Sequence, residues 1–401
     1  MQMIGNMSYG PKRLGFDSLR QLTVLFALFG VPAAAWSTQV SVAGFAFAGD
    51  SAGAAERFPY TQKIFQAQKV SGGANSFSRL VLDKAKDVKN SEFEFVPGGM
   101  VNLKNDQALM TALVLTGEIV SVENYGSYYK TFVNLRGDAL LFDDKQKKII
   151  RSCPLSVVLF DATADKPTEE RIANFVNDLI RRDDGRGLVT QFTRCLDRLS
   201  PPRDGLKTVQ VRKGEVSREA LALMPEALQK KPETVNAMFA DSLASILSAK
   251  LGISMLPTSL GDVGGVMAMR LENGDDINLK VPEGDYIFAV KLNKLAKIKT
   301  SENNISAGYI YAAYVSLRFY EPLLETTYIE TDLKNGESTV IPSSQVNTDD
   351  FAGYQDAIRG LFLKFSDAIQ KPDSKWIGVA ASAKNIASQL ESARTTLKGS
   401  K

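Results

Sequence analysis

Residues 309–319 read YIYAAYVSLRF, and this stretch decides the fold class. Apolar and aromatic side chains recur at every second position, which is the period of a β-strand with one buried face. The residues on the face expected to pack against helices are Tyr309, Tyr311, Ala313, Val315, Leu317 and Phe319. Tyr314, Arg318 and Tyr320 fall on the opposite face. Because Tyr and Arg are enriched in protein interfaces, these three residues are the candidate interface. The alternative is an ordinary amphipathic strand whose hydroxyls reach water.

A similar pattern occurs earlier in the chain. Residues 132–136 read FVNLR, which resembles YVSLR at 314–318, and each stretch precedes a segment with helical spacing of apolar residues. The matched helical positions are Ile172, Phe175, Val176 and Leu179 against Ile358, Leu361, Phe362 and Phe365. The order of the matches predicts a tandem duplication. We therefore expect an α+β protein of two related αβ modules, each a small, mainly antiparallel sheet packed by helices. The alternative is that two unrelated modules share patterns common to strands and helices.

Composition sets the expected boundaries. We expect a loosely ordered segment, a first module, a charged Pro-containing linker, a second module and a C-terminal helix, at 49–76, 77–199, 200–233, 234–370 and 371–401. Within the second module, Asn335-Gly336 predicts a hairpin turn.

Residues 1–48 have the parts of a secretory signal peptide: basic residues, an apolar stretch and small residues at two possible cleavage sites, Ala35 and Ala48. An uncleaved anchor over Leu22–Ala48 and a buried helix are the alternatives. The positive flank precedes the apolar stretch, so we expect the remainder outside the cytoplasm. The expected location is periplasmic or secreted, with a possible association with the outer membrane. The membrane would be contacted only through the N-terminal segment, if it is uncleaved.

The composition excludes several functional classes. The chain has 401 residues, 48 Lys+Arg against 45 Asp+Glu, and no His. The small net charge gives no case for nucleic acid. The absence of His removes Ser-His and Cys-His dyads and the common zinc ligand sets. We predict no catalytic residue, no cofactor and no metal.

The remaining chemical motifs are weak. Ser127 and Lys130 fit an S-x-x-K pattern, but they lie between predicted strands, where a solvated turn is the simpler interpretation. The acidic residues Asp275, Asp276, Glu283 and Asp285 lack the spacing of a calcium loop.

Cys153 and Cys195 are the two cysteines of the chain. In an oxidising compartment they could pair, and the helical spacing around Cys195 would then join a helix to the third predicted strand. Two buried free thiols are the equal alternative.

A family resemblance rests on the second module. Phe239-Ala240-Asp241-Ser242-Leu243 lies in a predicted helix, Asp285-Tyr286-Ile287-Phe288 begins a strand, and 314–318 forms a later one. This order resembles the periplasmic αβ domain of the TolB amino-terminal domain, the curli secretion-channel lipoprotein and penicillin-binding-protein activator lipoproteins. The chain lacks their lipobox Cys, and Phe319-Tyr320-Glu321 replaces the Asp that usually follows the later strand. The resemblance implies a non-catalytic adaptor in envelope assembly and carries over no functional residue.

The sequence therefore predicts an exported, non-catalytic binding or adaptor protein of the bacterial cell envelope, with envelope proteins as partners. A secreted His-free hydrolase, based on Ser-Lys or carboxylates, and a periplasmic small-ligand carrier are the alternatives. A pocket enclosing two carboxylates would favour the hydrolase, and a large apolar cavity would favour the carrier. A flat aromatic sheet face or an exposed edge strand would favour the adaptor.

Overall fold

The computed structural model describes residues 38–49, 51–70, 76–98, 109–201, 205–258, 265–343, 345 and 348–400, and Thr38–Lys401 forms one compact unit. The first half holds β1 (Thr38–Ala48), α2 (Ser51–Arg57), α3 (Pro59–Val70), α4 (Phe77–Lys86), β2 (Phe93–Pro97), β3 (Leu109–Asn124), β4 (Tyr129–Asp143), β5 (Lys148–Thr163), α5 (Glu169–Arg181) and α6 (Leu188–Leu196). The second half holds β6 (Val209–Val216), α7 (Arg218–Leu221), α8 (Glu226–Gln229), α9 (Pro232–Leu251), β7 (Val266–Leu271), β8 (Asp276–Lys280), β9 (Tyr286–Glu302), β10 (Ser306–Glu321), β11 (Thr326–Pro342), α10 (Asp350–Gln370), α11 (Lys375–Ala380), α12 (Ile386–Leu397) and the short 3-10 helix η2 (Lys398–Ser400).

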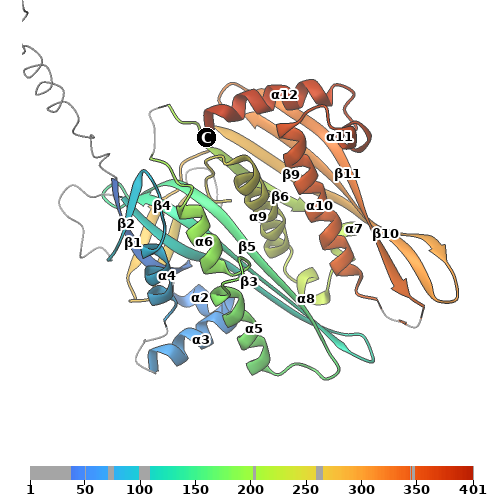
Figure 1. The fold of residues 1–401 in the computed structure, drawn as a ribbon, viewed down its shortest axis with the longest axis horizontal. Coiled ribbons are helices and arrows are strands. Elements are labelled where there is room, and N and C mark those ends of the chain that lie inside the picture. The colour runs from blue at the N-terminus through green and yellow to red at the C-terminus, as the bar shows by residue number, and fades with distance from the viewer. Residues whose placement is uncertain are drawn as a thin grey trace, which may run out of the picture. The chain divides into compact units, whose positions relative to one another are not determined.

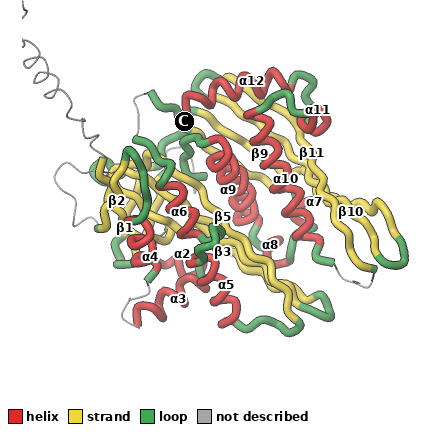
Figure 2. Tube along the Cα trace, viewed as in Figure 1, coloured by secondary structure: helices red, strands yellow, loops and turns green. Residues whose placement is uncertain are grey.

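Within these described ranges the strands form two sheets, shown in Figures 1 and 2. The first is seven-stranded with the order β2-β1-β3-β4-β5-β8-β7, and the second is four-stranded with the order β11-β10-β9-β6. In the first sheet β7 also pairs with β1, where Ala46 lies opposite Leu271, so the strands β1-β3-β4-β5-β8-β7 return to their start. The architecture is α+β, as the sequence predicts.

The two sheets share an order of strands. In the first, β1 lies parallel to β3, and β3, β4 and β5 follow as an antiparallel meander. In the second, β6 lies parallel to β9, and β9, β10 and β11 follow in the same way. FVNLR lies in β4 and YVSLR in β10, the central strand of each meander, and the helices α5 and α10 follow. The match is topological, and the tandem duplication stays a prediction.

The alternating pattern of β10 is realised as a two-faced strand. Ala313, Val315, Leu317 and Phe319 are at most 2% exposed and belong to one core with side chains of α9 and α10. Phe319 stacks on Phe288 of β9 with ring centroids 4.3 Å apart. Burying one face of a strand against helices is what a period of two provides.

We call each sheet with the helices packed on it a layer; α9 and α10 belong to the second. A buried ion pair joins the two layers. Arg136 of β4 binds Asp241 of α9, and their side chains are only 6% and 10% exposed. Thr258 donates a further hydrogen bond to the Asp241 carboxylate. Gly117 of β3 leaves the space that the guanidinium occupies, since a Cβ there would overlap Arg136 Nη2. A larger residue at this position would therefore displace the Arg136 guanidinium.

The N-terminal boundary predicted at Ala48 is wrong. Residues 38–48, the second apolar stretch, form β1, which lies between β2 and β3 and has Val40 and Phe45 fully buried. Cleavage at Ala48 would remove a core strand, and an anchor over Leu22–Ala48 would take the same residues out of the sheet. The cleavage site at Ala35 and the rest of the predicted signal peptide lie outside the described residues. No helix in the part that the structure describes has the length and apolar character needed to span a membrane.

Two segments expected to be irregular contain helices or a strand in their described parts. Within 49–76, the helices α2 and α3 bring Phe58 and Thr61 into fully buried positions. Within the predicted linker 200–233, β6 is a strand of the second sheet, and α7 and α8 follow it. Charge and proline content suggested a linker, but β6 begins with three buried residues, Val209, Gln210 and Val211, and its charged residues follow them.

The predicted module boundaries also need correction. The hairpin β7–β8 falls within 234–370 but pairs with the first sheet. Residues 371–401 form α11, α12 and η2 instead of one helix, and Leu390 and Ala393 are fully buried in the core of the second layer. Asn335-Gly336 is not a turn: Asn335 lies inside β11 opposite Ala313, and the chain reverses near Glu325.

Cys153 of β5 and Cys195 of α6 form a disulfide. It closes a loop with a sequence separation of 42 residues and joins α6 to the sheet. A loop of this length contributes on the order of 4 kcal/mol in a chain-entropy account.

A truncation tests the boundary at Thr38. A chain beginning at Thr38 should fold, and one beginning at Gly49 should not. The loss of β1 exposes the partners of Val40, Phe45 and Phe47, each at most 1% exposed and each contributing roughly 2 kcal/mol by burial. The combined contribution of these three side chains is a large part of the ~5–15 kcal/mol stability of a domain. Urea unfolding followed by circular dichroism would measure it, and an unchanged midpoint in the shorter chain would contradict the assignment of β1.

Candidate functional site

The candidate interface lies on the face of the second sheet that points away from α9 and α10. Arg318 is exposed, while Tyr314 and Tyr320 are half-buried on the same face of β10. The Arg318 guanidinium lies over the Tyr320 ring, 4.7 Å from its centroid. It also donates to Thr327 Oγ1 at 2.9 Å. The structure therefore brings Arg318 and Tyr320 together, and Tyr314 follows along the strand.

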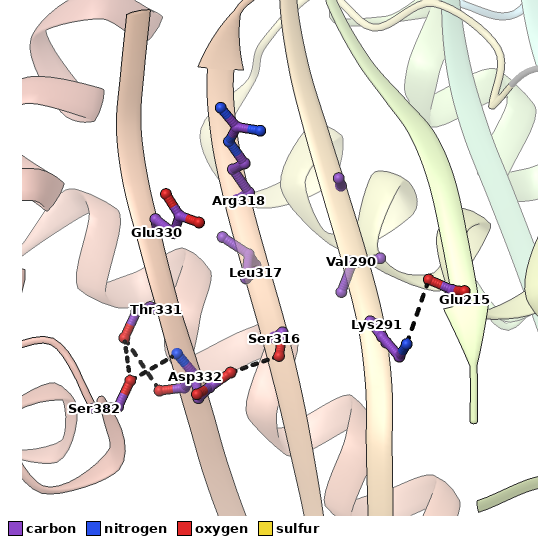
Figure 3. Close-up of a pocket in the computed structure, with 11 residues that line it drawn as sticks. Glu215, Val290, Lys291, Ser316, Leu317, Arg318, Glu330, Thr331, Asp332 and Ser382 are labelled. Atoms are coloured by element: carbon purple, nitrogen blue, oxygen red, sulfur yellow. Dashed lines mark hydrogen bonds and ion pairs between the residues drawn. The ribbon is translucent and has the colours of Figure 1, made fainter. Parts of the chain in front are cut away.

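Charged residues of the neighbouring strands surround these three positions. Tyr314 lies between Lys334 of β11 and Lys294 of β9, and Arg318 lies opposite Glu330. Figure 3 shows Arg318, Glu330 and Asp332 on this face. On the same face, toward β6, Lys291 forms an ion pair with Glu215 at 3.7 Å. A shallow depression of about 400 Å³ lies between these side chains.

Hydrogen bonds order the centre of this face. Ser316 accepts from Asn293 Nδ2 at 2.7 Å and donates to Asp332. The loop after α11 covers the outer edge of β11 at Asp332, because Asp332 N–H donates to Ser382 Oγ at 2.9 Å and Ser382 N–H donates to Asp332 O at 2.9 Å. We name this surface, centred on Tyr314, Ser316, Arg318 and Tyr320, the open face.

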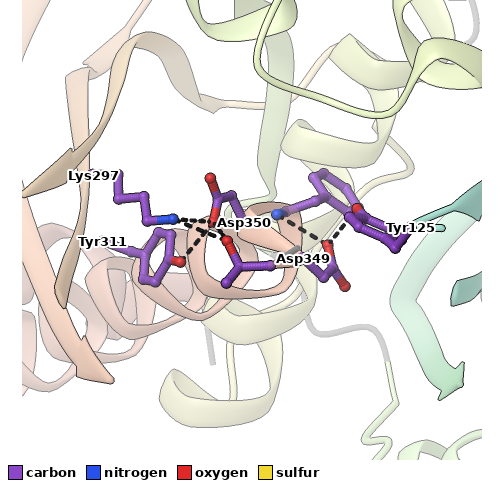
Figure 4. Close-up of polar contacts among 7 residues, drawn as sticks. Tyr125, Lys297, Tyr311, Asp349 and Asp350 are labelled. Carbon is purple, nitrogen blue, oxygen red and sulfur yellow. Dashed lines mark hydrogen bonds and ion pairs between the residues drawn. The ribbon is translucent and has the colours of Figure 1, made fainter. Parts of the chain in front are cut away.

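The start of α10 holds the two layers together, as Figure 4 shows. Asp349 accepts from Lys130 Nζ of β4 at 3.2 Å and from the hydroxyl of Tyr125, in the turn between β3 and β4, at 3.4 Å. Asp350 accepts from Lys297 Nζ and the Tyr311 hydroxyl, each at 2.7 Å, both of the second sheet. Burial, with the neighbouring carboxylates next, raises the pKa of both tyrosines. These hydroxyls therefore stay protonated donors, and the cluster acts as a structural clamp.

This clamp engages the lysine of the Ser-Lys hypothesis. Ser127 is exposed in the turn between β3 and β4, where its N–H donates to Tyr125 O at 3.1 Å. Lys130 Nζ forms an ion pair with Asp349 Oδ2 at 3.2 Å. A general base for Ser127 would need its amine directed at the Ser127 hydroxyl, whereas this amine is directed at Asp349.

Three of the four acidic residues considered for an ion are engaged with cations. Asp276 binds Arg270 at 2.9 Å, Glu283 binds Arg212, and Asp285 binds Lys207 at 3.0 Å. Asp275 instead accepts a hydrogen bond from Asn273 Nδ2 at 2.8 Å. Burial alone would raise the pKa of Asp285, but hydrogen bonds from Thr208 and Lys207 outweigh it and lower that pKa. Across the residues whose positions are described, no group of three or more Cys, Asp or Glu side chains could hold a metal ion.

Asp138 is a buried carboxyl group that no sequence pattern indicates. It lies on β4 two residues after Arg136, is 5% exposed, and accepts a hydrogen bond from Ser152. Burial first, and then the charge of Asp241, raise its pKa from an ordinary 3.8 to about 7. A shifted carboxyl in a cleft would suggest catalysis. Asp138 does not line the large cavity described below, so it has a structural place beside the ion pair.

Comparisons with known proteins identify no family for the chain. No family model matches, and no curated protein matches. Solved structures similar to part of it include a putative neuraminyllactose-binding hemagglutinin homolog from Helicobacter pylori, at 18% identity and TM-score 0.27 over 44% of this chain and 91% of that one. A DUF330 protein from Xanthomonas campestris has 11% identity and TM-score 0.23 over 50% and 95%. A minor lipoprotein from Acinetobacter baumannii has 8% identity and TM-score 0.19 over 41% and 89%. These TM-scores carry no argument about function, and the resemblance to the TolB and curli families stays a prediction.

The pKa of Asp138 predicts a pH dependence of stability. Because its folded pKa is raised above the unfolded value, its contribution is fully present below about pH 4 and is lost as the pH rises to about 7. Between these limits the free energy of unfolding should fall by up to ~1.4 kcal/mol per pH unit from this group. Urea unfolding at a series of pH values would measure the slope.

Asp138→Asn removes the titrating group and should flatten the slope between pH 4.5 and 7. Asp165→Asn, in the exposed turn after β5, is the matched control and should keep the slope of the natural chain. An identical slope in Asp138→Asn and the natural chain would show that Asp138 is not the group that titrates.

Proposed function

We propose that this chain is an exported, non-catalytic binding protein of the bacterial cell envelope and that it holds a partner protein on the open face. The observation that carries the proposal is the open face itself. Helices cover one side of this sheet, and the other side exposes Arg318, Glu330, Asp332 and Lys334. These charged side chains are typical of the polar rim of a protein interface. The half-buried Tyr314 and Tyr320 supply the aromatic centre.

The disulfide supports the compartment. Disulfides such as Cys153–Cys195 form and persist in oxidising spaces, and in most cells the cytosol keeps thiols reduced. This agrees with the predicted signal peptide if its cleavage site is the one at Ala35. The periplasm or the cell surface is therefore the proposed location.

The alternatives fit less well. Asp356 is the carboxylate that lines the large cavity of about 1030 Å³, so this cavity does not enclose a pair of catalytic acids. A carrier would need an enclosed apolar cavity between sheet and helices. This cavity is instead a groove with arginines along its wall, among them Arg194 and Arg198.

Site-directed photocross-linking tests the open face. A photoreactive phenylalanine derivative at Lys334, opposite Tyr314, should give a discrete adduct with an envelope protein in intact cells. The same residue at Lys375, exposed on α11, is the control and should give none. Because truncation of a central interface Arg often costs about 2 kcal/mol or more, Arg318→Ala should reduce the Lys334 adduct at least tenfold.

Loss of the adduct in Arg318→Ala counts only if that variant unfolds at the same urea concentration as the natural chain. Equal adducts from positions 334 and 375, or an adduct insensitive to Arg318→Ala, would contradict the proposal. A cytoplasmic location of the mature chain, with Cys153 and Cys195 reduced, would contradict the export part separately.

A further inference from the structure

The outer edge of β5 forms the floor of a groove between two helices. Beyond Lys148, which lies opposite Lys280 of β8, and the isolated bridge of Ser152 to Met255, no strand among the described residues pairs with this side of β5. The groove has a volume of about 1030 Å³. In Figure 1, α6 and α9 flank β5. Residues of α6, α9 and α10 line the walls.

Backbone directions along β5 can be read from its hydrogen bonds. Ser152 N–H donates to Met255 O at 2.8 Å, and Gln191 Nε2 donates to Ser156 O at 3.4 Å, both on the outer side. Val157 O instead accepts from Asn134 of β4 at 3.2 Å. Because successive residues of a strand direct their peptide groups to opposite sides, the even-numbered residues of this stretch face the groove.

Val158 and Phe160 therefore direct backbone N–H and C=O groups outward, and no described residue pairs with them there. Their side chains are 44% and 39% exposed. Such an edge is a template for a further strand. The outer edge of β11 differs at Asp332 and Leu333, where Ser382 and Ala381 cover it.

The walls of the groove are basic. The cationic residues that line it are Arg151, Arg186, Arg194, Arg198, Lys250 and Arg359, and the acid is Asp356. Arg194 and Arg198 donate to the carbonyl oxygens of Gly185 and Ala249, at 3.1 and 3.4 Å. With Arg186, they form no ion pair with any residue in the described ranges. Their charges are therefore available to an anionic partner.

We propose that this groove binds an extended acidic peptide segment of a partner protein, which pairs with β5 at Ser156–Phe160 as an added strand. Main-chain hydrogen bonds to Val158 and Phe160 would supply affinity, as in other cases of strand addition. The arginines select acidic side chains on the added strand. A second copy of this chain fits less well, because two basic edges would repel. The proposal does not depend on the open face, which lies on the other sheet.

A peptide titration tests the proposal with the full-length protein. The probe is a fluorescein-labelled decapeptide that alternates Val with Glu, and its counterpart alternates Val with Lys. Fluorescence anisotropy should show saturable binding of the acidic peptide that weakens with salt, and at least tenfold weaker binding of the basic one. No saturable binding of the acidic peptide would overturn the proposal.

Val158→Pro tests strand addition directly. Proline removes the outward N–H of Val158 and leaves the hydrogen bonds between β4 and β5 in place, and edge strands tolerate it. Binding should weaken at least tenfold, whereas Val158→Thr, which keeps the N–H, should stay within threefold. Arg194→Ala with Arg198→Ala should also weaken binding at least tenfold.

A second measurement covers the case in which Val158→Pro fails to fold. The acidic peptide N-methylated at alternate residues loses half of its backbone donors and should bind the natural chain at least tenfold more weakly. Hydrogen exchange at Val158 and Phe160 should slow when the unmodified peptide binds. Equal affinity of the methylated peptide would mean that the arginines bind an anion without strand pairing and would overturn the proposal. So would a dimer in sedimentation that Val158→Pro dissociates, which would assign the edge to self-association.

Discussion

The buried ion pair between Arg136 and Asp241 is the constraint on which the arrangement of the two layers depends. A charge taken out of water is costly unless it is paired, so neither residue can be buried without the other. Arg136 extends from β4 and Asp241 from α9, which fixes the helix of the second layer against the sheet of the first. Gly117 provides the space, and the raised pKa of Asp138 is a consequence of burial in the same place. The clamp at Asp349 and Asp350 makes a second connection near the start of β4, where Lys130 lies.

This arrangement leaves two surfaces uncovered. Because α9 and α10 pack on one side of β10, the other side keeps Tyr314, Arg318 and Tyr320 at the surface. Because α9 and α6 flank β5, and no strand within the described ranges lies between them, the edge at Val158 and Phe160 stays unpaired there. Each surface offers contacts of a kind used in protein recognition.

The sequence predicted the elements whose periodicity is strong. The alternation in β10 and the helical spacing in α5 and α10 gave the α+β class and the helix-facing residues. Hydrophobicity alone could not separate β1 from a signal peptide, because a strand buried on both faces is as apolar as an export segment. Contacts between residues far apart in the chain could not be predicted from the sequence either. Glu272, for example, accepts from Ser78 N–H at 2.7 Å at the start of α4, and nothing in either segment indicates the other. The same holds for the groove, since its walls come from three helices far apart in the chain.

The central claim is that Arg136 and Asp241 make the two layers one folding unit. Pulsed hydrogen exchange across a urea series, read by mass spectrometry on peptides from β4 and from β10, measures this most directly. The account predicts one shared midpoint for both strands in the natural chain. It also predicts that Asp241→Asn lowers both urea midpoints together, because the substitution leaves a buried Arg unpaired. The corresponding loss in the free energy of unfolding is ~3–5 kcal/mol. Separate midpoints for β4 and β10 in the natural chain would contradict it.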